Sequence, residues 1–409
     1  MHSNDTRQTR SWTPLLVVVL VAAGTVLSTS MGIRQSLGLF LGPITSGTGL
    51  SIAMFGLAMA VQNLAWGIGQ PFMGALADRF GGQLVIIAGA VCFAVGLLLM
   101  RLGSAFGLFL GGGLMIGLAV AATSHGVLVG IISRIAPAKV RALAVSILAA
   151  VGSLGTFLIA PATQMSLDLF SWQTTLMILA GLAAAIGLLA AAFRTNGAAA
   201  AQAPTERPDA IGAIRQALRH PGYVAMTVAF FACGFQLIFV ATHLPNFIAI
   251  CGLPASLSAQ AIALIGVFNA LGTLAAGQLG ERFGHKQVLG AIYVLRTVAI
   301  ASYAFLPVSI ESTLVFGAAM GLLWLSVIPP VSALINSLFG ATNFGALFGV
   351  MFLSHQLGAF LGAYLGGLSF DVTGDYAVAW ASLVGVGALA ALIQFSMDDR
   401  PRRDAPAAA

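Results

Sequence analysis

Charged side chains are scarce in this sequence. Among its 409 residues only 12 are aspartate or glutamate and 18 are lysine or arginine, which together make up 7% of the chain. A soluble globular protein carries about 25% charged residues, so there are too few here to cover a water-facing surface. Apolar residues make up 59% of the chain and the mean hydropathy is +0.98. The composition therefore excludes a set of soluble domains and indicates a protein with many membrane spans.

Several patterns that enzymes need are also missing. The two lysines, Lys139 and Lys286, lie outside any G-x-x-x-x-G-K-[ST] loop, so the chain lacks the P-loop that binds ATP phosphates. There is no H-E-x-x-H motif. The three cysteines are odd in number and unclustered, which favours neither a disulfide framework nor a metal site. We therefore expect no enzyme activity, no cofactor and no metal.

Apolar segments long enough to cross a membrane, about 20 residues each, recur twelve times along the chain. They cover residues 14–41, 52–74, 84–102, 105–132, 141–163, 172–193, 222–250, 258–280, 287–307, 312–335, 344–368 and 376–397. The longest interval between them, 194–221, is polar and rich in alanine and proline, and we expect a short surface helix at its end, over 211–218. The sequence thus predicts a six-helix unit at 1–193, a linker at 194–221 and a second six-helix unit at 222–409.

The placement of basic residues sets the expected orientation. With the N-terminus in the cytoplasm, 15 of the 18 lysines and arginines fall in cytoplasmic segments and only Arg101 falls outside. The remaining two, Arg34 and Arg296, lie within spans. We therefore expect a multi-pass protein of a bacterial-type inner membrane with both termini in the cytoplasm. The same asymmetry accounts for the pI near 9.7 without a nucleic-acid partner.

An internal repeat divides the chain into halves. The octet GALADRFG at 74–81 returns as GQLGERFG at 277–284, an offset of 203 residues, and each copy ends the second span of its half. The chain is therefore a six-plus-six duplication.

Each octet places a carboxylate beside an arginine in a cytoplasmic turn, where helix N-termini and the arginine can pair with it. The pairs are Asp78 with Arg79 and Glu281 with Arg282. We expect a latch that is made in one conformation and broken in another. A solvated charged turn is the alternative.

The octets, the span number and the central linker resemble the major facilitator superfamily, whose loop signature reads G-x-L-A-D-R-x-G-[RK]-[RK]. The first copy departs from it at Gly82 and Gln83, whereas the second keeps His285 and Lys286. This resemblance implies an all-helical membrane protein with twelve helices in two pseudo-symmetric six-helix bundles. It also implies a central cavity between them that opens to each side in turn.

Shorter stretches resemble the monocarboxylate and oxalate/formate-type transporters of that superfamily. They run from Lys139 to Pro161 and from Phe344 to Tyr376. Those families often carry an arginine in the eighth span that holds the substrate carboxylate. Here Asn269 is the only strong polar group of that span, so the resemblance does not carry over the identity of the substrate.

Ionisable groups inside a membrane cost about 2.5–3.5 kcal/mol on insertion scales. The span cores contain no aspartate or glutamate, but they contain Arg34 in span 1 and Arg296 in span 9. An arginine without an internal anion indicates an anion supplied by the cargo, because a guanidinium can hold a carboxylate with two hydrogen bonds. We expect Arg34 to bind the cargo, with a side chain that reaches to the membrane surface as the alternative. For Arg296 we favour a structural role.

Histidine supplies the expected proton carrier, because its pKa lies near neutral. His355 lies near the middle of span 11 and is the first candidate for cargo binding and proton coupling, followed by His243 and His125. The further candidates for contact with the cargo are Gln356, Asn269, Asn63 and Gln236. Each of these could instead join helices to one another.

These patterns predict a secondary transporter that moves a small organic anion, most simply a monocarboxylate, as a monomer in the lipid bilayer. An ion gradient or exchange must drive it, since the chain has no ATP site. An exporter of lipophilic compounds is the alternative, although buried arginines without buried acids argue against cationic drugs. A membrane enzyme or a sensor is more remote, because the chain shows neither clustered catalytic groups nor an output domain.

Overall fold

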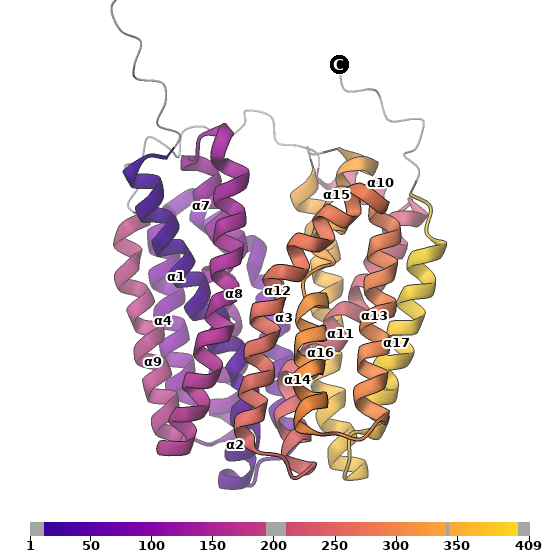
Figure 1. The fold of residues 1–409 in the computed structure, drawn as a ribbon. Coiled ribbons are helices and arrows are strands. Elements are labelled where there is room, and N and C mark those ends of the chain that lie inside the picture. Colours follow the sequence, from indigo (N-terminus) through magenta and orange to yellow (C-terminus); the bar gives the residue numbers. More distant parts are fainter. Residues whose placement is uncertain (1–11, 194–209, 341–342, 400–409) are drawn as a thin grey trace, which may run out of the picture.

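A computed structural model describes residues 12–193, 210–340 and 343–399 (Figure 1). All regular structure within these residues is helical. Among the described residues, twelve helical stretches are long and apolar enough to cross a membrane, which confirms the predicted number of spans. Each predicted span overlaps one of them.

The first half contains α1 (Pro14–Ser36), η1 (Leu37–Phe40), α2 (Leu41–Thr48), α3 (Ile52–Phe80), α4 (Gly82–Met100), α5 (Ala105–Gly107), η2 (Leu108–Met115), α6 (Ile116–Thr123), α7 (His125–Ile135), α8 (Ala138–Leu169), α9 (Trp172–Leu189) and η3 (Ala190–Phe193). The second half contains α10 (Ala210–Ala217), α11 (Pro221–Ile250), α12 (Ala255–Phe283), α13 (His285–Phe305), α14 (Ile310–Leu323), α15 (Ile328–Phe339), α16 (Phe344–Thr373) and α17 (Ala377–Ser396).

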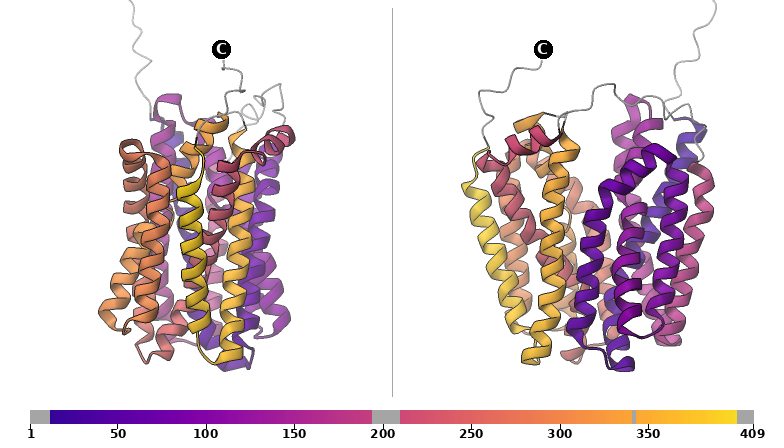
Figure 2. Two further views of the ribbon diagram at one scale, coloured as in Figure 1. Left: turned by 90° about the vertical axis from the view of Figure 1, so that its right-hand side faces the viewer. Right: turned by 180° about the vertical axis from the view of Figure 1, so that it is seen from behind.

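The helices form two bundles, one from each half of the chain, that stand side by side (Figures 1 and 2). The start of α1, the end of α17 and the short helix α10 lie at the same end of the molecule, which we call the terminal face. α10 is the surface helix expected near 211–218. Where the bundles meet, α3 packs along α16 and α8 packs along α12.

Spans 4 and 10 are each interrupted partway along, which the sequence analysis did not predict. Span 4 breaks at Ser124, whose backbone is extended (φ −91°, ψ −177°), between α6 and α7. Span 10 breaks between Leu323 and Ile328, at the corresponding place of the other half. Broken helices at matching positions of two repeats are typical of transporters and expose backbone groups near the substrate path.

The side chain of Arg296 caps the helix end at the break in span 10. Pro329 and Pro330 have no N–H, so they cannot continue the hydrogen bonding of α14 into α15. The guanidinium of Arg296 is fully buried and donates from Nη2 to the carbonyl of Leu323 and, at 3.2 Å, to that of Trp324. A cation at the C-terminal end of a helix is also favoured by the helix dipole. These two bonds favour the structural role expected for Arg296, although its Nε and Nη1 are buried without a hydrogen-bond partner.

The two bundles touch along the half of the molecule that lies away from the terminal face. A side chain at Gly56 would collide with the backbone of Ala363, and one at Gly367 would lie 2.6 Å from the carbonyl of Ile52. Nearer the terminal face, Gly74 of α3 and Gly349 of α16 have open space where a side chain would project. The bundles therefore diverge toward the terminal face, as Figures 1 and 2 also show.

Candidate functional site

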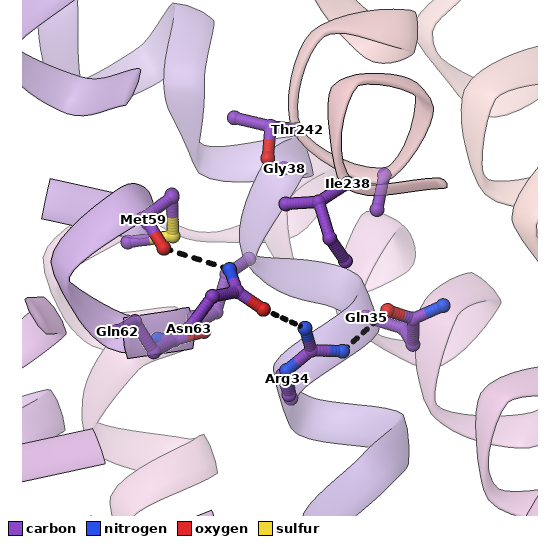
Figure 3. A pocket seen from close by; sticks show the side chains of 10 residues that line it. Arg34, Gln35, Gly38, Met59, Gln62, Asn63, Ile238 and Thr242 are labelled. Atoms are coloured by element: carbon purple, nitrogen blue, oxygen red, sulfur yellow. Dashed lines mark hydrogen bonds between the residues drawn. The ribbon is translucent and has the colours of Figure 1, made fainter. Parts of the chain in front are cut away.

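Arg34 lies on α1 where the two bundles meet, and its guanidinium is held by two neighbours (Figure 3). Nη2 donates to Asn63 Oδ1 at 2.6 Å, and Nη1 donates to Gln35 Oε1 at 3.0 Å. Nε is buried without a hydrogen-bond partner. None of the described residues places a carboxylate within ion-pair distance of it. The charge of Arg34 is therefore positioned by neutral groups and left without a counter-ion.

A chain of hydrogen bonds connects Arg34 to the other bundle. Asn63 lies on α3, and its backbone carbonyl accepts a bond of 2.8 Å from Gln356 Nε2 on α16. Gln356 Oε1 in turn lies 3.1 Å from His355 Nδ1. Asn63, Gln356 and His355 are all buried. The structure thus brings together four of the six predicted cargo contacts, although Arg34 and His355 do not touch.

This chain also fixes which nitrogen of His355 carries a proton. A carbonyl can only accept, so the group of Gln356 that meets the Asn63 carbonyl must be its NH₂. The oxygen of Gln356 therefore faces His355, and Nδ1 of the ring is the donor. Nε2 is then the position at which the neutral ring can take up a further proton.

Two aromatic rings fill the space between Arg34 and His355. The guanidinium carbon of Arg34 lies 4.7 Å from the ring centre of Trp66, a cation–π contact. Trp66 meets Phe352 edge to face at 5.3 Å, and Phe352 lies parallel to His355 at 5.9 Å. The Arg34 guanidinium therefore lies against one ring of this aromatic pair, and the His355 imidazole lies against the other.

The cavity beside Arg34 is small. It is lined by Asn63, Gln62 and Met59 of the first bundle and by Ile238 and Thr242 of the second (Figure 3). Its volume of about 20 Å³ has room for roughly one water molecule. A larger guest would require the helices around Arg34 to move.

Two predicted contacts lie elsewhere and join helices. Gln236 is fully buried and donates to the carbonyl of Leu383, which connects α11 to α17. Asn269 donates to Ser153 Oγ of α8 at 3.2 Å, and its oxygen accepts from the backbone N–H of Leu325 in the span 10 break at 3.0 Å. Asn269 therefore links the two bundles at a point apart from Arg34.

The other two candidate histidines, His243 and His125, differ in their surroundings. Both ring nitrogens of His243 are engaged, since Nε2 lies 2.7 Å from the carbonyl of Ala363 and Nδ1 lies 3.3 Å from the hydroxyl of Tyr376. His243 therefore joins α11, α16 and α17. His125 is the first residue of α7, directly after the break in span 4.

The paired octets lie at the terminal face. Glu281 Oε1 is 3.7 Å from His285 Nε2, whereas Arg282 lies over the ring of Phe283 at 5.2 Å. Arg79 has the same kind of contact, at 5.1 Å, with Phe80. The side chain of Asp78 lies outside the described residues. In this arrangement Glu281 is closer to a histidine than to the arginine that the sequence pairs with it.

Sequence reasoning missed several residues around the site. Gln35, which follows Arg34 directly, and Phe352 were not singled out, and Trp66 was expected to pack against other helices and not to line a cavity. Gln70 was also missed: its Oε1 accepts from Trp66 Nε1 at 2.7 Å and from Ser124 Oγ at 2.9 Å, so it joins the aromatic pair to the break in span 4. A polar residue one turn after Trp66 on the same helix was the available signal.

One known protein family matches the chain along nearly all of its length. A sequence model of the Major Facilitator Superfamily matches residues 18–327 and 266–409. The chain therefore belongs to this superfamily, as its paired octets predicted, and the twelve-helix fold in two bundles is that of its transporters.

Two individual proteins are also similar to this chain over most of its length. The transporter YcxA of Bacillus subtilis (strain 168), described as an uncharacterized MFS-type transporter, is 26% identical over 403 residues, which cover 94% of this chain and 95% of the relative. Monocarboxylate transporter 11 of Mus musculus is 28% identical over 383 residues, which cover 89% of this chain and 83% of the relative.

Solved structures show the same fold at low identity. The nucleoside transporter NupG superposes with a TM-score of 0.76 at 15% identity, covering 94% of this chain and all of its own. A bacterial homologue of the human lysosomal transporter Spinster, in an inward-facing and unoccupied conformation, superposes with a TM-score of 0.77 at 14% identity. The match covers 94% of this chain and 97% of the homologue. This similarity concerns the fold alone.

Proposed function

We propose that this protein carries a small organic anion, most simply a monocarboxylate, across the membrane. The observation that carries the proposal is the state of Arg34, whose charge is held by neutral groups while its Nε has no partner. A carboxylate can bind the Nε and Nη2 edge of a guanidinium with two hydrogen bonds. The similarity to monocarboxylate transporter 11 supports this class of cargo.

The way the bundles meet supports transport by alternating access. They are in contact away from the terminal face and apart toward it. With the basic residues placed in the cytoplasm, the terminal face is cytoplasmic and this conformation faces inward. The membrane that we propose is a bacterial-type inner membrane. The cavity beside Arg34 must widen for a carboxylate, so binding and bundle movement are coupled.

His355 is the proposed proton carrier. Its Nε2 is free to take up a proton, and it is connected to Arg34 through Gln356 and Asn63. A proton on His355 would add a second positive charge near the anion. Transport would then depend on pH as well as on the cargo gradient.

A lipophilic cargo is the second candidate, and one observation favours it. Phe344, Phe348 and Phe352 recur every fourth residue along α16 from the terminal face toward His355, and each is partly exposed. Such a line of rings would suit an apolar molecule. The two candidates differ in Arg34, which an uncharged cargo would not need.

Binding near Trp66 gives the direct test. Purified protein in nanodiscs is titrated with a panel of monocarboxylates, dicarboxylates and uncharged lipophilic compounds while tryptophan fluorescence is recorded. Because Trp66 lies against Arg34, a bound anion should change its emission, and Trp66→Phe should remove that change. Saturable signals from lipophilic compounds, with none from any carboxylate, would contradict the proposal.

A further inference from the structure

The two bundles are joined at the face opposite the termini by a carboxylate on a helix end. Asp371, near the end of α16, accepts hydrogen bonds from the backbone N–H groups of Ile52, at 3.2 Å, and Ala53, at 2.9 Å, at the start of α3. The first N–H groups of a helix have no partner within it, and the helix dipole favours a negative charge there. This contact therefore holds the second bundle to the first.

The internal repeat contains a second copy of the same pair. Asp168, near the end of α8, precedes Asp371 by 203 residues, and Ile52 precedes Ala255, the first residue of α12, by the same interval. This is also the offset between the two octets. The duplication thus places an aspartate opposite a helix start twice, once on each side of the interface between the bundles.

The second copy is not engaged. Asp168 accepts from Gln164 Nε2 at 2.8 Å on its own helix, and α12 begins after Pro254 without a side-chain cap. Asp168 and Ala255 both line a cavity of about 270 Å³ between α8, α11 and α12. The carboxylate and the helix end therefore face the same space without touching.

We propose that Asp371 and Asp168 are a duplicated pair of latches that close the face opposite the termini, with the Asp371 latch engaged in this conformation and the Asp168 latch open. Release of Asp371 frees the start of α3 from the end of α16, which is the movement needed to open this face. When Asp168 reaches the start of α12, the cavity between them closes.

Asp371 is also a positioning residue for the site around Arg34. It fixes the register between α3 and α16, and these two helices carry Asn63 and Trp66 on one side and Gln356 and Phe352 on the other. A change at Asp371 therefore acts on the cargo site through the helices and not by contact.

Distances between spin labels test the latch without any cargo. In a background without the three native cysteines, labels are placed at the exposed Ser46 on α2 and Val378 on α17, and the distance distribution is measured in nanodiscs. Asp371→Ala should raise the population with separated bundles about fivefold relative to the closed one, the size expected for the loss of an N-terminal cap. Asp371→Asn keeps one acceptor oxygen and should give a smaller rise.

Asp375→Ala is the matched control. Asp375 accepts from the backbone N–H of Ala377 at the start of α17, so it caps a helix of its own bundle, and its loss should leave the distances unchanged. Equal distributions for Asp371→Ala and Asp375→Ala would overturn the latch. Asp168→Ala should leave the closed population intact, and an opening as large as that of Asp371→Ala would overturn the open state assigned to Asp168. Because no cargo is present, either result is independent of the proposed anion.

Discussion

Replacement of Arg34 is the sharpest test of the anion site, because its hydrogen bonds can be counted. The guanidinium has five N–H donors, and Gln35 and Asn63 use one each. Nε and one N–H of each Nη remain for a ligand. A carboxylate that binds the Nε and Nη2 edge would gain two of these donors.

The expected losses of affinity follow from the two hydrogen bonds that a carboxylate would receive from Arg34. A hydrogen bond to a charged group contributes about 1.5–3 kcal/mol net, so Arg34→Ala, which removes two, should weaken binding at least ~100-fold, since each 1.4 kcal/mol is a factor of ten. Arg34→Lys keeps the charge but has no planar fork. It should weaken binding about 10- to 100-fold, the cost of one of the two bonds.

Affinity is measured by titration of the best carboxylate from the binding panel, with Trp66 fluorescence as the readout. Arg101→Ala, an exposed arginine at the opposite face, is the control and should bind as the wild type does. A melting curve for each variant separates lost affinity from lost folding, since Asn63 and Gln35 lose a donor in Arg34→Ala. Wild-type affinity in a folded Arg34→Ala protein would refute the anion site.

Three further experiments test other parts of the structure. His355→Gln should flatten the pH dependence of uptake into vesicles but spare counterflow exchange, because glutamine forms hydrogen bonds and carries no proton; an unchanged pH profile would assign the coupling to another group, with His243 and His125 next. Arg296→Met should lower the melting temperature by leaving the carbonyls at the span 10 break without a donor, while cargo affinity stays the same; an unchanged melting temperature would contradict the capping role. The last experiment tests the orientation with a membrane-impermeant thiol reagent added from outside to a cysteine-free background. The reagent should label Val372→Cys, at a position 76% exposed at the face opposite the termini, and miss Ile211→Cys, at a position 74% exposed on α10. Labelling of Ile211→Cys without Val372→Cys would mean that the orientation is inverted.

Hydropathy predicted the helices well because the spans are separated by short polar turns. Ser51, Ser171 and Ser309 each cap the helix that follows, so several helix starts are marked in the sequence as well as in the structure. The breaks in spans 4 and 10 were missed, since both lie within continuous apolar runs. Pro329 and Pro330 were a usable signal for the second break, whereas Ser124 in span 4 resembles any buried serine.

The site was predicted less completely for a physical reason. Spans that are apolar on all sides give no periodic pattern from which the rotation of a helix can be derived. The sequence therefore offered Gln236 and Asn269 on equal terms with Asn63 and Gln356, although the first pair faces helix interfaces and the second lies beside Arg34 and His355. Arg34 and His355 were both expected to contact the cargo, but the aromatic rings between them were not expected.

The bond between Gln356 and Asn63 has a consequence for how variation would affect this protein. Its acceptor is a backbone carbonyl, which every amino acid at position 63 would supply. Substitution of Asn63 would therefore remove one of the two side chains that hold Arg34 and leave the link between the bundles in place. Substitution of Gln356 would remove that link and also free His355. The two partners of one hydrogen bond thus tolerate mutation very differently, and substitutions at position 63 would alter the proposed cargo site before they altered the movement of the bundles.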